Sequence, residues 1–182
     1  MDAALAWIGQ VFQWIGAFIP RWEIVTVTEA GIKHVRGIPR YCRPGKVHWY
    51  WPVTTKWETH PIARQSDRLE TLTMETADGK TFIVSATITY AIEDVMKLVP
   101  TTFNPVTTIV EIAQTALHDV LCELTWDALH LLQQQDKLKT QLKAQAQKEL
   151  ADYGVKVFRF KLNSLARCRV IKISQTTASE EN

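Results

Sequence analysis

The chain has 182 residues, of which 46% are hydrophobic and 22% are charged. This is the composition of one folded domain of ordinary size, and it excludes a disordered chain. The net charge of +2 is too small to indicate a polyanionic partner, and three cysteines outside any CxxC pattern favour a reducing compartment over a disulfide scaffold.

The first 22 residues carry no charge between Asp2 and Arg21, and their pattern predicts a helix that ends at Pro20. Apolar residues recur at three- and four-residue steps, as in a helix that lies in the membrane interface. We expect the membrane-contacting residues of this segment to be Trp7, Ile8, Val11, Phe12, Trp14, Ile15, Phe18 and Ile19.

Three other interpretations of this segment stay open. A spanning helix needs about 20 apolar residues, and the segment offers slightly fewer, with Gln10 and Gln13 inside it. A signal peptide would need a positive n-region and a small-residue cleavage site, neither of which is present. A buried helix of a soluble protein is the third. We predict a monotopic anchor, and the positive residues after it favour the cytoplasmic side of the membrane.

After the anchor, alternating patterns predict strands over 23–28, 32–36, 46–51 and 57–61, with a loop from Gly37 to Gly45. There is no acidic residue between Glu29 and Glu58. Aromatic side chains in this basic stretch suit anionic head groups, although core packing and single-stranded nucleic acid are rival interpretations. We expect lipid contact by Trp49, Tyr50 and Trp51, and head-group contact by Arg21, Arg40, Arg43 and Lys46.

The turn dipeptide Asp78-Gly79 predicts a β-hairpin, with arms at 68–76 and 81–92. The second arm alternates over twelve residues, which predicts one buried and one open face. The expected buried residues are Phe82, Val84, Ala86, Ile88, Tyr90 and Ile92, and the other face carries Thr81, Ser85, Thr87 and Thr89.

From Asp94 onward the period becomes helical. We expect a short helix from Asp94 to Val99, a five-turn helix after Asn104-Pro105, and a charged helix over 126–153 that Gly154 stops. The core stripe of the five-turn helix is expected at Val106, Ile109, Ala113, Ala116, Val120 and Leu124, and that of the charged helix at Leu138, Leu142, Ala146 and Leu150. A strand over 155–162, continued at 170–173, and a polar tail complete an α+β order.

No catalytic or metal-binding motif is evident. His118 and Cys122 are four residues apart on a predicted helix, but no third ligand follows at a recognisable spacing. His118 and Asp119 could also support Ser85 or Cys122 as a nucleophile, but neither Ser85 nor Cys122 lies in a nucleophile-elbow motif. We therefore expect no enzyme activity, no metal and no cofactor.

Several motifs in order resemble the SPFH (band 7) domain of stomatins, prohibitins and flotillins. They are the extended stretch from Val25 to the turn at Gly31, the Arg43-Pro44-Gly45…Pro52 segment, the hairpin Thr76-Ala77-Asp78-Gly79, the strand end Tyr90-Ala91-Ile92-Glu93-Asp94, and Tyr153-Gly154-Val155-Lys156-Val157. Two features depart from the family: Asp136-Lys137 stands where an Arg is common, and no long coiled coil follows, so we expect assembly to rest on the domain itself.

The resemblance implies a curved, mostly antiparallel sheet with two packed helices, preceded by an N-terminal hydrophobic membrane helix. We expect an anchor at 1–22, the SPFH domain at 23–165 and a partly disordered extension at 166–182. The resemblance also implies a scaffold that self-associates into a ring or cage on the cytoplasmic leaflet. Such a scaffold organises a membrane patch or regulates membrane proteins such as proteases. The expected partners are membrane lipids and further copies of the chain, and not nucleic acid. The alternative is a peripheral or soluble binding module without large assembly.

Overall fold

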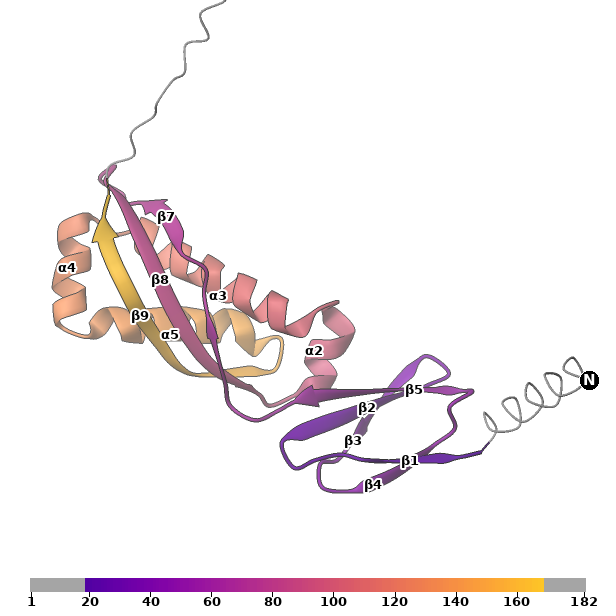
Figure 1. The fold of residues 1–182 in the computed structure, drawn as a ribbon. Helices are drawn as coiled ribbons and strands as arrows, with labels where there is room; N and C mark the ends of the chain where they lie inside the picture. The colour runs from indigo at the N-terminus through magenta and orange to yellow at the C-terminus, as the bar shows by residue number, and fades with distance from the viewer. Residues whose placement is uncertain (1–18, 169–182) are drawn as a thin grey trace, which may run out of the picture.

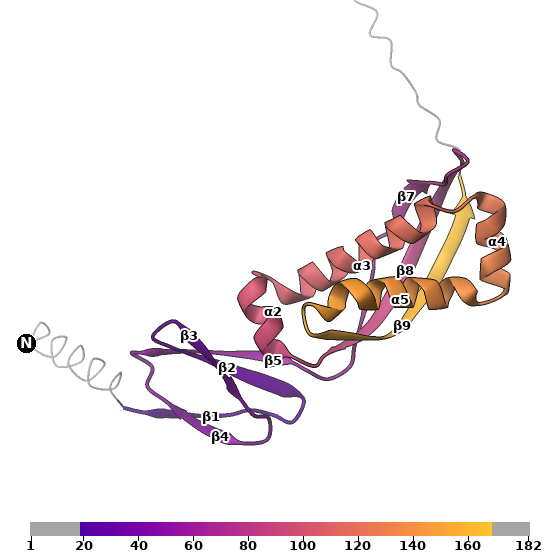
Figure 2. The same ribbon diagram turned by 180° about the vertical axis from the view of Figure 1, so that it is seen from behind.

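A computed structural model describes residues 19–168 of the chain. It has an elongated shape with two lobes (Figures 1 and 2). The N-terminal lobe, residues 21–61, contains strands only, whereas the C-terminal lobe, residues 65–167, combines a long sheet with helices. The α+β class predicted from the sequence is confirmed. The predicted anchor helix, the continuation at 170–173 and the tail fall outside the described residues, except for Ile19 to Trp22.

The N-terminal lobe is made of two small antiparallel sheets. The first pairs β1 (Arg21–Ile24) with β4 (Val47–Tyr50), and the second has the order β3-β2-β5, with β3 (Ile38–Cys42), β2 (Glu29–Val35) and β5 (Thr55–Pro61). The predicted loop from Gly37 to Gly45 is therefore wrong in part. Its prolines suggested a loop, but β3 is an edge strand, where Pro39 interrupts no inner ladder.

The sheet of the C-terminal lobe is built around β8 (Thr81–Ile92), which has the predicted bounds. On one edge β6 (Gln65–Arg68) and β7 (Leu72–Glu75) pair with successive parts of β8, and on the other edge β9 (Val155–Arg167) pairs along its length. The predicted hairpin arm 68–76 is thus correct only in part: its strand is β7, residues 69–71 are not strand, and Arg68 is the last residue of the separate strand β6. The six predicted core residues of β8 are all buried, which confirms the face assignment.

Two helices follow β8, and each has a side-chain cap. Asp94 accepts a hydrogen bond from the Met96 N–H at the start of α2 (Val95–Thr101), and Asn104 caps α3 (Pro105–Cys122), whose first residue is proline as predicted. The core stripe of α3 differs from the prediction at its ends. Val106 is exposed and Val120 only partly buried, because the buried stripe runs through Leu117 and Leu121 instead.

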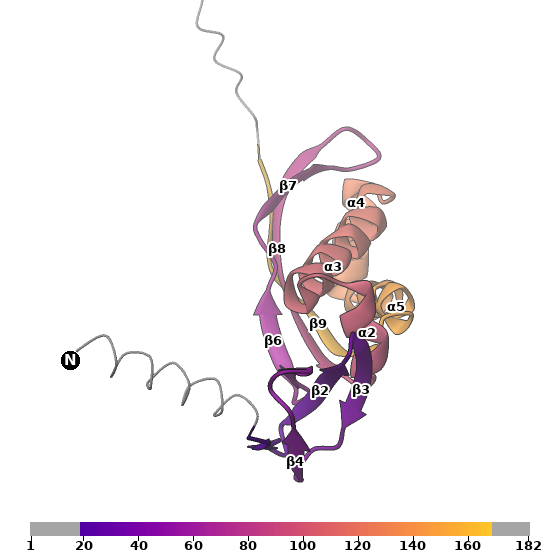
Figure 3. The ribbon, with the colours of Figure 1, turned by 90° about the vertical axis from the view of Figure 1, so that its right-hand side faces the viewer.

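The predicted helix over 126–153 is two helices, α4 (Trp126–Gln134) and α5 (Lys137–Ala151). The chain turns at Asp136, a non-glycine residue with a left-handed φ of 54°. The predicted stripe of α5 is confirmed, since Leu138, Leu142, Ala146 and Leu150 are all buried. Figure 3 shows that the helices lie on one side of the long sheet and leave its other face uncovered.

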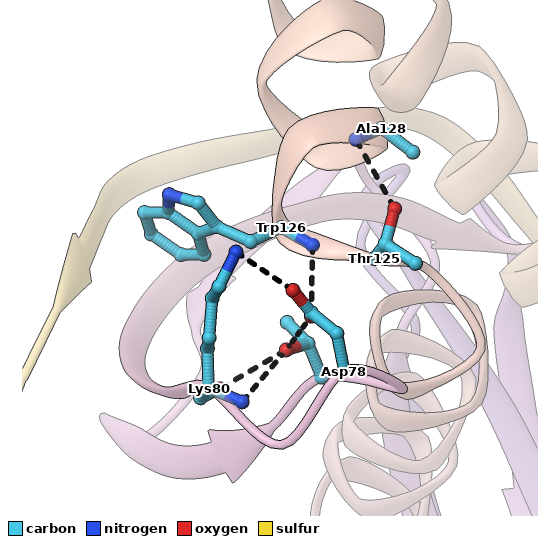
Figure 4. A network of polar contacts seen from close by, with 6 residues as sticks. Asp78, Lys80, Thr125, Trp126 and Ala128 are labelled. Carbon is cyan, nitrogen blue, oxygen red and sulfur yellow. Dashed lines mark hydrogen bonds and ion pairs between the residues drawn. The ribbon is translucent and has the colours of Figure 1, made fainter.

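The hairpin turn at Asp78 connects the sheet to the helices (Figure 4). The Asp78 carboxylate accepts the backbone N–H of Trp126 at 3.1 Å and pairs with Lys80 at 2.8 Å. These hydrogen bonds, with a further one from the Thr76 hydroxyl, hold the pKa of Asp78 far below its usual range. The Thr125 hydroxyl accepts the Ala128 N–H and caps the start of α4. The turn at Asp78, although distant in sequence, accepts another N–H of the same helix start, that of Trp126.

Gly154 makes the second long-range connection. It lies two residues after Asp152, the C-cap of α5, with a left-handed φ of 71°, and its carbonyl accepts the N–H groups of Glu93 and Asp94. A Cβ at this position would lie 2.7 Å from the Asp94 carbonyl oxygen. Glycine is therefore needed both for the backbone conformation and for the close approach of the two segments.

Candidate membrane interface

The β1–β4 ribbon, residues 21–24 and 47–50, presents an exposed apolar face. Its register sets Trp22 opposite Trp49 and Ile24 opposite Val47, so these four side chains share one side of the two strands. The two indole rings meet edge to face with centroids 5.3 Å apart. We call these residues the outer face; their exposed fractions are 65% for Trp22, 66% for Ile24, 54% for Val47 and 59% for Trp49.

The opposite side of the ribbon packs on the neighbouring sheet through Trp57 of β5. Tyr50 stacks on the Trp57 ring with centroids 5.8 Å apart, and His48 lies 5.9 Å away. Trp57 in turn lies close against β2, where a Cβ on Gly31 would be 2.7 Å from its ring. Glycine at this position lets the indole contact the strand, and that contact fixes which side of the ribbon points outward.

Backbone hydrogen bonds extend the ribbon beyond its ladder. The Gly45 N–H donates to the Val25 carbonyl at 2.9 Å, and the Val25 N–H donates to the Lys46 carbonyl at 3.2 Å. Gly45 has a φ of 72°, so the turn needs a residue that tolerates the left-handed region. Val25 is fully buried beneath this turn. The outer face is therefore held on a short but well-supported ribbon.

The structure distributes the predicted lipid contacts over both sides of this ribbon. Trp49 belongs to the outer face, and Trp51, which follows β4, is 52% exposed. Tyr50 points to the inner side against Trp57 and is half-buried. Ile19 is exposed before β1 and lines a shallow hollow together with Trp22 and Trp49. The other predicted residues of the anchor, from Trp7 to Phe18, lie outside the described part of the chain.

The predicted head-group residues are all exposed, but only some lie at the ribbon. Arg21 begins β1, and Arg43 and Lys46 lie in the connection that leads into β4. Arg40 lies on β3, in the neighbouring sheet, opposite Lys33. Within residues 19–168 none of these four cations is within 4 Å of a carboxylate. They are thus available to an external anion.

Of the four residues of the outer face, the sequence predicted only Trp49 as a lipid contact. Ile24 and Val47 lie in predicted strands but were not predicted to contact lipid, and neither was Trp22. The signal was the i, i+2 spacing of two apolar pairs, Trp22/Ile24 and Val47/Trp49. Strand alternation alone does not say which side is covered, because the pairing of β1 with β4 spans more than twenty residues of sequence.

The residues weighed for catalysis or metal binding do not form a site. His118 is exposed, and its imidazole lies 3.4 Å from the carboxylate of its neighbour Asp119. Burial raises the pKa of the Cys122 thiol, which disfavours a reactive thiolate. Among the described residues there is no group of three histidine, cysteine or acidic side chains placed to hold a metal ion.

In the part of the chain that the structure describes, every helix is too short or too polar to cross a membrane. Comparison with curated proteins gave no match. The sequence model of the SPFH domain / Band 7 family, by contrast, matches residues 23–175, well over half of the chain, and the antiparallel sheets with packed helices fit such a domain. The protein therefore belongs to the SPFH domain / Band 7 family, whose members are generally membrane-associated scaffolds without enzymatic activity.

Proposed function

We propose that this protein is a membrane-anchored scaffold whose N-terminal lobe rests on the lipid surface through the outer face of the β1–β4 ribbon. The observation that carries the proposal is the exposure of four large apolar side chains, including two tryptophans, on one side of two strands. Contiguous apolar patches on a folded surface mark contacts with proteins or membranes. Because the family is membrane-associated, lipid is the partner that we infer.

The chemistry of the patch suits the interfacial region of a bilayer. An indole ring can bury its apolar body and keep its N–H near the head groups, and tryptophan is enriched at that depth. Arg43 and Lys46 lie in the turn that leads into the ribbon, where each well-placed cation gains about 1 kcal/mol from anionic lipid. Trp22 and Trp49 would therefore insert while neighbouring cations contact phosphate groups.

The N-terminal segment supplies the second contact of this proposal. Its apolar helical pattern, from Trp7 to Ile19, leads directly into β1 at Arg21, so both contacts belong to the same end of the chain. Stable attachment to a membrane generally takes two signals. We propose that the segment lies in the cytoplasmic leaflet and that the ribbon fixes the orientation of the domain above it.

We further propose that copies associate into a ring or cage around a membrane patch and regulate membrane proteins such as proteases within it. Family membership supports this part of the proposal. Within residues 19–168, the charged surface of α5 opposite its buried stripe is solvent-exposed, as an interface or an ordinary surface would be. A strictly monomeric mass of the full chain in mild detergent would contradict assembly.

Binding of the full chain to vesicles tests the lipid contact. The double variant Trp22→Ser/Trp49→Ser removes both indoles, and Phe103→Ser/Leu131→Ser is the control because both residues are exposed in the C-terminal lobe. Burial of one large apolar side chain is worth about 1.5–3 kcal/mol, so we expect the double ribbon variant to need roughly tenfold more lipid or more for half-maximal sedimentation. The control should bind as the wild type does.

Equal binding of the ribbon variant and the wild type would contradict the proposed lipid contact. A variant that lacks residues 1–20 tests the anchor separately. Its full retention on vesicles would remove the anchor from the proposal and leave the ribbon as the attachment.

A further inference from the structure

The long sheet of the C-terminal lobe has one covered and one uncovered face. Phe82, Val84 and Ile88 of β8 point to the helices and are fully buried. On the other side of the sheet, no described element covers the strands (Figure 3). In Figure 1 this open side of β8 and β9 faces the viewer, with α3 and α5 behind it.

The uncovered face is basic. Two cross-strand rows run over β6, β8 and β9, namely Arg68–Thr87–Lys161 and Ser66–Thr89–Arg159. We call these six residues the basic face. β6, β8 and β9 place no acidic residue on this side. The neighbouring carboxylates are Glu75, at the far end of β7, and Glu70, which is exposed in the β6–β7 connection. No carboxylate of the described chain lies within 4 Å of Arg68, Arg159 or Lys161.

Hydroxyl and amide side chains on this side are already paired with one another. Ser66 and Thr89 are 2.8 Å apart, the Asn163 amide donates to Thr87 at 2.8 Å, and Ser85 and Ser164 are 2.7 Å apart. These cross-strand hydrogen bonds hold the surface in one conformation. The polar groups of the basic face without a side-chain partner in the described chain are therefore its three cations, Arg68, Arg159 and Lys161. A partner that complements them is anionic.

An acidic surface lies on α3. Between Lys97 and Lys137 the sequence has no lysine or arginine, and α3 carries the exposed carboxylates Glu111 and Asp119. We call these two residues the acidic surface; Glu123 is not part of it, because it lines a hollow next to Lys148 of α5. Figure 2 shows α3 and α4 on the side of the sheet opposite the basic face. The two surfaces of one copy therefore cannot meet each other.

We propose that the basic face of one copy docks on the acidic surface of a second copy. The inference rests on the proposed self-association and names the surfaces that would make it. Because the two surfaces differ, the contact is heterologous, and repetition of it produces a ring when the rotation closes and a filament when it does not. Complementary charge then sets the direction in which copies add.

The composition of the face favours this partner over other polyanions. Single-stranded nucleic acid is usually held by exposed aromatic rings, and the ring of Phe158, next to Arg159 in sequence, is covered by the Arg64 guanidinium at 3.9 Å. A lipid surface would be met at the apolar outer face, which belongs to the other lobe. Lys156, at the end of the same sheet, is neutralised by Glu93 at 2.7 Å. The basic face is thus a patch with a limited extent.

Charge reversal on full-length protein in mild detergent tests the proposal. Variant one, Arg68→Glu/Lys161→Glu, makes the basic face acidic, and variant two, Glu111→Lys/Asp119→Lys, makes the acidic surface basic. Alone, each places like charges together, so we expect association at least roughly tenfold weaker than in the wild type by sedimentation velocity. Mixed together, the variants are again complementary, and association should return to within about threefold of the wild type.

A matched control has the same charge change elsewhere. Arg36→Glu/Lys56→Glu replaces two exposed cations of the N-terminal lobe, away from both docking surfaces, and should associate as the wild type does. Wild-type association that persists in variant one and variant two would overturn the docking surfaces and leave the proposed scaffold standing. The docking surfaces would also be overturned if variant one lost binding to anionic vesicles or to single-stranded DNA while its self-association stayed unchanged. A monomeric wild type would contradict the proposed function itself, and this inference with it.

Discussion

Apolar side chains of the long strand point into the core in the C-terminal lobe, whereas those of the ribbon point outward in the N-terminal lobe. In the C-terminal lobe the alternating residues of β8 point to α3 and α5 and are buried, and charge is left outside. In the N-terminal lobe the β1–β4 ribbon turns Trp22, Ile24 and Trp49 to the outside, because the inner side is occupied by Trp57. A sheet face is buried only when a second layer covers it. The ribbon has no such layer among the described residues, so its second layer is the proposed membrane.

The largest expected effect comes from truncating aromatic residues in the two lobes. Phe82→Ala removes a fully buried ring from the core of the C-terminal lobe, and it should lower the free energy of unfolding by about 3–5 kcal/mol. Trp49→Ala removes a larger ring that is 59% exposed, so we expect a loss of about 1 kcal/mol or less, mainly its contact with Trp22. Urea unfolding of both variants measures the difference. Equal losses would break the comparison between the lobes.

Two glycines with left-handed φ angles give the next effect. Gly154→Ala in the C-terminal lobe meets the Asp94 carbonyl as well as a strained backbone, whereas Gly37→Ala in the β2–β3 turn has nothing within 4 Å. Backbone strain alone costs about 1 kcal/mol, so Gly37→Ala should lose that much and Gly154→Ala clearly more, about 2–3 kcal/mol. Thermal unfolding of the two variants ranks them. Similar melting temperatures would mean that the segments near Asp94 move apart at little cost.

The smallest expected effect is the loss of the stability contribution of Asp78 at acid pH. Asp78 connects the hairpin to α4, and its pKa in the folded protein is well below the ordinary aspartate value of about 3.9. Its contribution to stability is therefore complete above about pH 4 and is lost as the pH falls toward the folded pKa. We expect the stability difference between wild type and Asp78→Asn to be largest at pH 7 and to shrink progressively below pH 4. Urea midpoints at pH 7, 4, 3 and 2 measure it; a difference that does not change with pH would contradict the role of the charge.

Local sequence patterns were sufficient to predict the long strand and the buried side of the last helix in the C-terminal lobe. The alternation over 81–92 predicts β8 with its faces, and the spacing of Leu138, Leu142, Ala146 and Leu150 predicts the buried side of α5, because each pattern is set by neighbours in the same element. The break at Asp136 was missed. Neither glycine nor proline marks it, and the chain turns there to carry α5 back along the sheet next to β9.

The N-terminal lobe was harder to predict because its arrangement depends on contacts between strands far apart in sequence. The segment 38–42 contains Pro39 and still forms the edge strand β3. Only one of the four residues of the outer face was predicted as a lipid contact, for the same reason. Trp49 was identified from its basic and aromatic surroundings, but its partner Trp22 and the inward turn of Tyr50 follow from the register of β1 with β4 and the stacking on Trp57.

The most direct test of the central claim compares two sites of similar exposure, one in each lobe. Val47 is 54% exposed on the outer face of the ribbon, and Leu131 is 57% exposed on α4. Nitroxide labels are attached to Val47→Cys and Leu131→Cys in full-length protein whose native cysteines have been replaced by serine. The accessibility of each label to oxygen and to a water-soluble nickel chelate is then measured on anionic vesicles. We expect the label at position 47 to gain oxygen contact and lose nickel contact, while the label at 131 stays in water. A membrane-bound protein in which both labels remain in water would contradict the account.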